Sequence, residues 1–153
     1  MNSFRMRTAS LLLMSSAALL AMTACTTPAS SASGGAPSVP LEGTQWRLAS
    51  LGGQAVPAPA GVREVSLLLD GAQHRASGFA GCNQFVSGYA LSGATLRFER
   101  PAATMMACPA LAQEQSYLDA LNATAGWRVA GVRLQLLDAQ GKARAEFTAR
   151  PAR

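Results

Sequence analysis

The sequence has few of the side chains that enzymes use for metal, acid–base or nucleophilic chemistry. Its 153 residues include one histidine and three cysteines. We expect His74, which lies between Gln73 and Arg75 near a predicted turn, to be a surface residue. One histidine and two cysteines do not supply the four ligands of a structural zinc site. We therefore predict that the protein holds no metal ion and no cofactor.

Sequence signatures of catalysis are also missing. The Asp and Glu residues are scattered, and no two have a spacing that defines an acid–base pair. Ser77 and Ser87 lack the G-x-S-x-G context of a nucleophile, and no C-x-x-C redox motif is present. We predict that the protein is not an enzyme and has no catalytic residues. A cell-wall or lipid enzyme is a less favoured alternative, because it requires a pocket of converging polar groups.

The basic residues do not form a cluster. The chain has 13 Lys plus Arg against 8 Asp plus Glu, and the basic side chains are spread over its length. They are not interleaved with aromatic residues in the pattern of a nucleic-acid-binding surface. We predict that the protein binds no nucleic acid and that most of these side chains face solvent. A weak attraction to anionic lipid or cell-wall polymer is the alternative.

The first 24 residues have the pattern of an export signal. Arg5 and Arg7 precede an uncharged, largely apolar stretch at residues 9–22, which is too short to span a bilayer. Residues 20–25, Leu-Ala-Met-Thr-Ala-Cys, resemble the lipobox of bacterial lipoproteins. We predict a signal peptide over 1–24 and lipid on Cys25, which attaches the protein to a membrane. The alternative is an ordinary secretory signal that leaves Cys25 as a free thiol.

The residues after Cys25 favour a tether rather than a folded segment. Residues 25–40 are small and uncharged, with a root-mean-square reach of about 20 Å when flexible. The folded domain is then residues 41–150. Thr26, in place of Asp, is compatible with sorting to the outer membrane, facing the periplasm.

Apolar and polar residues alternate with period two over most of residues 41–150, which indicates a mainly β domain. A helix is predicted over 109–123, with Pro109 early in the helix and Gly126 as its stop signal. This pattern favours a strongly curved antiparallel sheet or open barrel of about seven to eight strands with one helix. The predicted strands are residues 46–51, 65–69, 73–78, 85–91, 95–98, 127–129, 133–137 and 143–148.

Residues 78–89 form a sharply turned β segment with Cys82 at its corner, because glycines there alternate with apolar side chains. In an exported protein, Cys82 and Cys108 are more often joined than free. A disulfide closing a loop of this length stabilises the fold by about 3.5 kcal/mol. Two reduced, buried thiols are the alternative.

Met105 and Met106 stand beside the second of these cysteines. We predict that both methionines pack in the core. The alternative is an adaptable apolar patch that faces a partner, since methionine side chains fit surfaces of varied shape.

Three runs carry a family resemblance: L-E-G-T-Q-W at residues 41–46, G-C-N-Q-F-V-S-G-Y at 81–89 and T-M-M-A-C at 104–108. Together they resemble the META domain family, also called the HslJ family. The resemblance implies a small β-rich domain, common in heat-inducible or antibiotic-tolerance-linked envelope lipoproteins and similar in fold to lipid-binding pilot lipoproteins. It implies no established catalytic activity. Met105 stands where relatives often have a basic residue.

The resemblance also implies structural roles for the motif residues. Gly81 and Asn83 form a turn, Cys82 and Cys108 the staple, Phe85 and Tyr89 part of the core, and Trp46 the anchor of the first strand, with Gly88 and Met106 completing the motifs. The predicted function is contact with an envelope protein, or with an apolar ligand in the mouth of the sheet, in envelope stress or antibiotic tolerance. The alternative is a periplasmic inhibitor of a lysozyme or protease.

Overall fold

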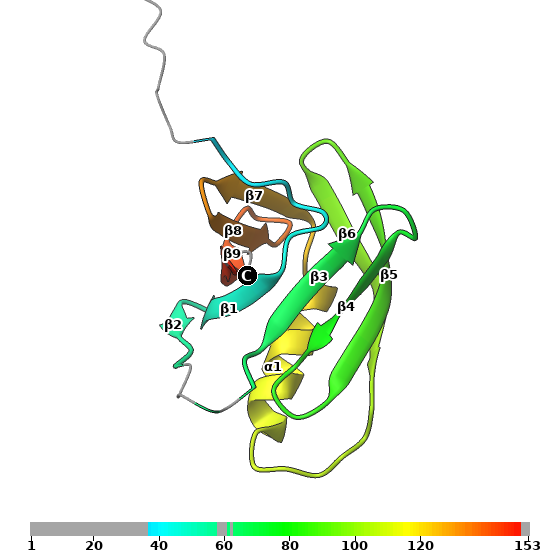
Figure 1. Ribbon diagram of the computed structural model, residues 1–153, viewed down its shortest axis with the longest axis vertical. Helices are drawn as coiled ribbons and strands as arrows, with labels where there is room; N and C mark the ends of the chain where they lie inside the picture. Colours follow the sequence, from blue (N-terminus) through cyan, green and yellow to red (C-terminus); the bar gives the residue numbers. More distant parts are fainter. Residues whose placement is uncertain (1–36, 58–60, 62, 151–153) are drawn as a thin grey trace, which may run out of the picture. The chain divides into compact units, whose positions relative to one another are not determined.

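The computed structural model describes residues 37–57, 61 and 63–150 (Figure 1). The predicted signal peptide and Cys25 lie outside the described residues, as does most of the predicted tether. The described part contains nine strands and one helix. They are β1 (Trp46–Leu51), β2 (Gln54–Ala55), β3 (Ser66–Asp70), β4 (Arg75–Phe79), β5 (Gln84–Ser92), β6 (Thr95–Ala103), α1 (Leu111–Asn122), β7 (Gly126–Ala130), β8 (Arg133–Leu137) and β9 (Ala143–Ala149).

All strand pairs in the sheet are antiparallel. The order is β2-β1-β3-β4-β5-β6-β7-β8-β9. Strand β1 also pairs with β9, so the hydrogen-bonded strands from β1 to β9 lead back to β1. Such a ladder requires strong curvature, which the sequence pattern predicted. The mainly β class with one helix is therefore confirmed, and the short strand β2 is an addition to the expected set.

The apolar run at residues 65–69, Val-Ser-Leu-Leu-Leu, is typical of a strand buried on both faces, but this prediction is wrong because the structure buries one face only. Leu67 and Leu69 are fully buried, whereas Ser66 and Leu68 are only half-buried on the opposite side of β3. Successive side chains of a strand point to opposite faces of the sheet. The buried apolar residues of the helix pack in the core, on the inner face of the sheet. The other side of β3 is therefore the outer face of the sheet.

Strand β6 continues five residues beyond its predicted end at Phe98. The expected stop was reasonable because Pro101 lacks the N–H that a ladder uses. The structure has a register shift in the β5–β6 pairing between Val86 and Gly88, and Arg100 has a φ of 49°. A bulge at this point lets the strand pass through the proline and pair again at Ala102.

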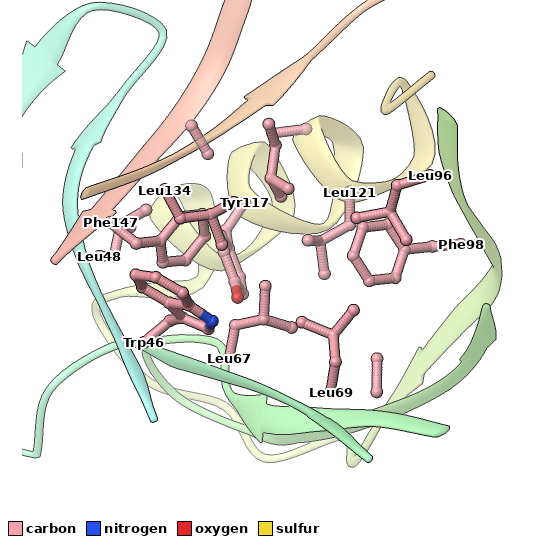
Figure 2. Close-up of a cluster of buried hydrophobic side chains, with 14 of the residues drawn as sticks. Trp46, Leu48, Leu67, Leu69, Leu96, Phe98, Tyr117, Leu121, Leu134 and Phe147 are labelled. Atoms are coloured by element: carbon pink, nitrogen blue, oxygen red, sulfur yellow. The ribbon is translucent and has the colours of Figure 1, made fainter. Parts of the chain in front are cut away.

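Helix α1 supplies aromatic and aliphatic side chains to the core. Figure 2 shows Tyr117 on the side of Trp46 and Leu67, and Leu121 on the side of Leu96 and Phe98. The Tyr117 ring makes an edge contact with Phe85, at a centroid distance of 5.7 Å. Its hydroxyl donates to the Ser66 carbonyl oxygen at 3.2 Å. Burial raises the pKa of Tyr117, so the phenol stays protonated and keeps this hydrogen bond.

The helix boundaries differ slightly from the prediction. Pro109 precedes the N-cap residue, Ala110, rather than standing in the first turn. Gly126 does not end the helix but opens β7, since the helix already ends at Asn122. The turn after the helix is closed by Thr124, whose hydroxyl donates to the Ala120 carbonyl oxygen at 2.8 Å.

The predicted anchor role of Trp46 agrees with its environment. The indole is fully buried, and its Nε1 donates to the Leu41 carbonyl oxygen at 2.9 Å. This bond satisfies the one polar atom of a large apolar side chain. It also fixes the segment that leads into β1.

Candidate functional site

Asn83 is the centre of a buried polar network. Its Oδ1 accepts hydrogen bonds from the Thr104 hydroxyl and the Met106 N–H, both at 2.8 Å. Its Nδ2 donates to Glu114 Oε1 at 2.8 Å and to the Met106 carbonyl oxygen at 3.2 Å. A side-chain amide has two acceptor sites and two donor hydrogens, so every one is used. Asn83 therefore does more than form a turn: it holds a distant segment by both backbone groups of Met106.

Glu114, in the first turn of α1, is the second member of this network. Its carboxylate is buried and accepts from the backbone N–H of Cys82 at 3.2 Å and of Asn83 at 2.6 Å. Burying a carboxylate is costly unless hydrogen bonds replace its water, and these donors do so together with the Asn83 amide. The start of a helix is also favourable for a negative charge. Glu114 thus ties α1 to the turn between β4 and β5.

The disulfide between Cys82 and Cys108 is present, which confirms the predicted pair. The Cα atoms of the two residues lie 6.1 Å apart. Gly81, directly before Cys82, has a φ of 126°, a conformation that favours glycine, in agreement with its predicted turn role. The segment at residues 104–108 is therefore fixed at its end by the disulfide and in its middle by Asn83.

We call residues 104–108 the methionine loop, because its two methionines face solvent. Met105 is 99% exposed and Met106 is 62% exposed. The prediction that they pack in the core is wrong, and the alternative of an exposed apolar patch describes them better. The physical reason is that the Asn83 amide binds both the N–H and the carbonyl oxygen of Met106. With its backbone held in this way, the side chain of Met106 is directed away from the interior. Leu111, 44% exposed, adds apolar surface at the start of α1.

Tyr89 and Gly88 lie on β5, within the sheet rather than in the methionine loop. The Tyr89 ring is buried, as predicted, and its hydroxyl donates to Glu42 Oε1. Burial, this hydrogen bond and the nearby negative charges of Glu42 and Asp70 raise the pKa of Tyr89. A Cβ at Gly88 would lie 2.6 Å from Glu99 Oε2, so the outer face is crowded there. Phe85, also predicted as core, is buried and contacts Tyr117.

The site contains no converging reactive groups. His74 is exposed in the turn before β4, where its ring edge contacts Tyr89. The Ser87 hydroxyl donates to the Gly88 carbonyl oxygen at 2.7 Å. In residues 37–57, 61 and 63–150, no group of three or more His, Cys, Asp or Glu side chains gathers as a metal ion would require. What this arrangement offers is a fixed apolar surface.

Sequence reasoning did not assign roles to Thr104 and Glu114 in this network. Thr104 belongs to the T-M-M-A-C run, but Glu114 is 31 positions from Asn83 and has no local pattern that pairs the two. Only the fold brings the helix start to the β4–β5 turn.

None of the helices in the described part of the chain has the length and hydropathy needed to cross a membrane.

These features define a small β domain that presents a fixed loop. A family model of the META domain matches residues 39–151. The chain therefore belongs to the META domain family, as the three sequence runs indicated. No curated protein matches the chain.

Two solved structures are similar to this chain. One is the NMR structure of a protein from Burkholderia xenovorans, with 29% sequence identity and a TM-score of 0.59, covering 73% of this chain and 85% of that chain. The other is also an NMR structure, with 22% identity and a TM-score of 0.53, covering 70% of this chain and 87% of that chain. The second likeness is one of fold alone.

Proposed function

We propose that this protein is a non-enzymatic, lipid-anchored protein of the bacterial envelope that binds another envelope protein through the methionine loop. The observation that carries the proposal is the exposure of Met105 and Met106 on a backbone held by Asn83 and the disulfide. A loop that is already ordered loses little conformational entropy when a partner binds. Methionine is enriched at protein interfaces, and its flexible thioether adapts to the surface it meets.

The location follows from the sequence. In this proposal, lipid on Cys25 attaches the chain to a membrane, and the tether predicted from the sequence lets the domain reach a partner near that membrane. The last residues of the predicted tether belong to the domain, since Ser38 and Val39 bond to the backbone of Gly131. We propose the periplasmic face of the outer membrane, and a role in envelope stress or antibiotic tolerance in keeping with the family resemblance.

A protein partner is better supported than an apolar ligand inside the sheet. The interior positions are occupied by large side chains, among them Trp46, Tyr117 and Phe147, all fully buried. Interiors packed in this way have no room for a further apolar group. Among the large apolar side chains of the described residues, Met105 and Met106 of the methionine loop are the most exposed.

Site-specific photo-crosslinking in living cells tests this proposal. A photoreactive amino acid replaces Met105 in one variant and Gln140, exposed in the β8–β9 turn, in the control. We expect a discrete protein adduct from position 105 and none from position 140. No adduct at position 105, or the same adducts at both positions, would contradict the proposal.

The membrane anchor needs a separate test. Replacement of Cys25 by Ala should release the protein from the membrane fraction and lower its mass by that of the lipid. Unchanged fractionation and mass would refute lipidation while leaving the binding surface unaffected.

The braced loop also favours the second candidate, an inhibitor of a lysozyme or protease. Such inhibitors insert a rigid, projecting loop into the enzyme, and Met105 projects fully. If this is the function, the purified protein inhibits at least one enzyme of a lysozyme and protease panel, and Met105→Asp abolishes that inhibition. Failure against the whole panel would remove this candidate.

A further inference from the structure

A polar groove lies on the outer face of the sheet. Its volume is about 340 Å³. Its floor is formed by side chains that alternate with buried core residues along β3, β4 and β5: Ser66, Leu68, Ser77, Gln84 and Val86. We call it the arginine groove, because Arg47, Arg63 and Arg150 line it together with Glu64.

Two of the arginines share one carboxylate. Arg47 Nη1 lies 3.2 Å from Glu64 Oε1, and Arg150 Nη2 lies 2.7 Å from Glu64 Oε2. The side chain of Glu64 is 23% exposed, whereas those of Arg47 and Arg150 are 41% and 47% exposed. The carboxylate is thus more deeply placed, and each guanidinium lines the groove with N–H groups that Glu64 does not use.

The third arginine is held differently. The Arg63 guanidinium carbon lies 4.5 Å from the centroid of the Phe79 ring, in a cation–π contact. Within the described ranges, Arg63 has no carboxylate at ion-pair distance. Stacking on an aromatic ring fixes the plane of a guanidinium but leaves its N–H donors free for another acceptor.

The groove therefore has a surplus of positive charge. Three guanidinium groups and one carboxylate line it, which leaves two positive charges without a partner of opposite sign in the groove. Guanidinium groups bind the oxygens of phosphate with paired, charge-assisted hydrogen bonds. A phosphate monoester carries a charge of about −1.5 to −2 at pH 7, which matches this surplus, while a phosphodiester or a carboxylate carries half of it.

We propose that the arginine groove binds a phosphate monoester group. Arg63 and the free N–H groups of Arg47 and Arg150 hold the phosphate oxygens, and the hydroxyls of Ser66 and Ser77 face the bound group from the floor. Glu64 orients two of the arginines but competes with the ligand for their charge. This site is independent of the partner surface proposed above.

Two sources provide a phosphate monoester: a phospholipid headgroup and a soluble phosphate compound. Titration of the full-length protein, followed by calorimetry, separates them with four probes. They are inorganic phosphate, short-chain phosphatidic acid, short-chain phosphatidylglycerol as the diester, and short-chain phosphatidylcholine as the neutral control. Tighter binding of phosphatidic acid than of inorganic phosphate assigns the lipid source, and equal binding assigns the soluble one. Both results support the proposal.

Substitutions in the groove should change the affinity for phosphate in opposite directions, which a merely structural role would not produce. Arg63→Gln should weaken phosphate binding by about tenfold, because one charge-assisted contact is worth about that factor. Arg150→Gln, at the exposed end of the described chain, should weaken it several-fold. Glu64→Gln should strengthen binding several-fold, since it removes the competing charge. Arg97→Gln, an exposed arginine on β6 outside the groove, should leave binding unchanged.

Three results would overturn the proposal. The first is no saturable binding of inorganic phosphate or of phosphatidic acid by the unsubstituted protein. The second is binding that Arg63→Gln and Arg150→Gln both leave unchanged. The third is a Glu64→Gln variant that keeps the thermal unfolding midpoint of the parent but binds more weakly. A Met105→Ser variant should bind phosphate normally, which separates this test from that of the partner surface.

Discussion

The β8–β9 hairpin and the methionine loop are ordered by different physical means. The hairpin has a backbone ladder from Arg133↔Thr148 to Leu137↔Ala143 with one register shift between Leu136 and Leu137, and buried side chains alternate along both strands. The methionine loop belongs to no strand or helix. Its first residue keeps one backbone bond, from the Thr104 N–H to the Gln84 carbonyl oxygen at 3.1 Å, and the rest is held by one disulfide and the side chain of Asn83. Local backbone pairing makes the first region insensitive to most single polar substitutions. The second depends on a few buried groups, so single substitutions there should have large effects.

The largest effect is expected from Asn83→Ala. The substitution removes four hydrogen bonds and leaves the backbone of Met106 without its side-chain partner. Glu114 keeps only the backbone N–H groups of residues 82 and 83. We expect the free energy of unfolding to fall by about 4 kcal/mol, near 1 kcal/mol for each bond. Urea denaturation measures this change. Asn122→Ala, at the exposed end of α1, is the control and should change it by less than about 0.5 kcal/mol; equal effects would break the comparison.

Removal of the disulfide should have the next largest effect. Replacing Cys82 and Cys108 together by Ala frees one end of the methionine loop, and we expect a loss of about 3.5 kcal/mol. The NMR signals of residues 104–108 should change more than those of β8 and β9. Mapping of the unsubstituted protein without reductant should find the two cysteines in one linked peptide pair, and separately alkylated cysteines would refute the bond.

A smaller effect is expected from Tyr117→Phe in the core. The change removes the hydroxyl bond to the Ser66 carbonyl, which contributes about 1 kcal/mol. The raised pKa of Tyr117 means that its stabilising effect is complete below pH 10, the ordinary value, and decreases as the pH rises above it. Unfolding measured between pH 8 and 11 should therefore show a weaker alkaline loss in the variant. An unchanged pH dependence would contradict this role.

The smallest change in stability is expected from Met105→Ser. Its side chain is fully exposed, so the free energy of unfolding should change by less than about 0.5 kcal/mol. Binding of the envelope partner, measured by the crosslinking yield from a photoreactive residue at position 111, should nevertheless fall several-fold. A stability loss above 2 kcal/mol would mean that Met105 packs against the fold after all.

The elements that were predicted best from the sequence are those formed by contacts between residues close together in the chain. Strand β8 has the predicted bounds. Residues 138–141, Asp-Ala-Gln-Gly, are typical of a hairpin turn, and Asp138 forms one by accepting from the Gln140 and Lys142 N–H groups at 3.0 and 2.9 Å. In both cases neighbouring residues carry the signal: alternation in the strand, and a short acceptor side chain in the turn.

The candidate site was less predictable because its contacts join distant parts of the chain. The disulfide was expected from the number and compartment of the cysteines, but composition does not place Glu114 on the N–H groups of Cys82 and Asn83. The exposure of Met105 was missed for a related reason. An apolar residue is expected inside unless the backbone around it is held elsewhere. Here the restraint acts on the neighbouring Met106 and comes from Asn83, more than twenty positions away.

Amide hydrogen exchange at Met106 tests the central claim most directly. Because the Met106 N–H donates to the buried Asn83 Oδ1, its exchange should be slowed to a rate comparable with the amides of β5, although its side chain is mostly in solvent. In Asn83→Ala this protection should disappear. Exchange of Met106 in the unsubstituted protein as fast as that of an unstructured peptide would show that the methionine loop is not held, and would contradict the account.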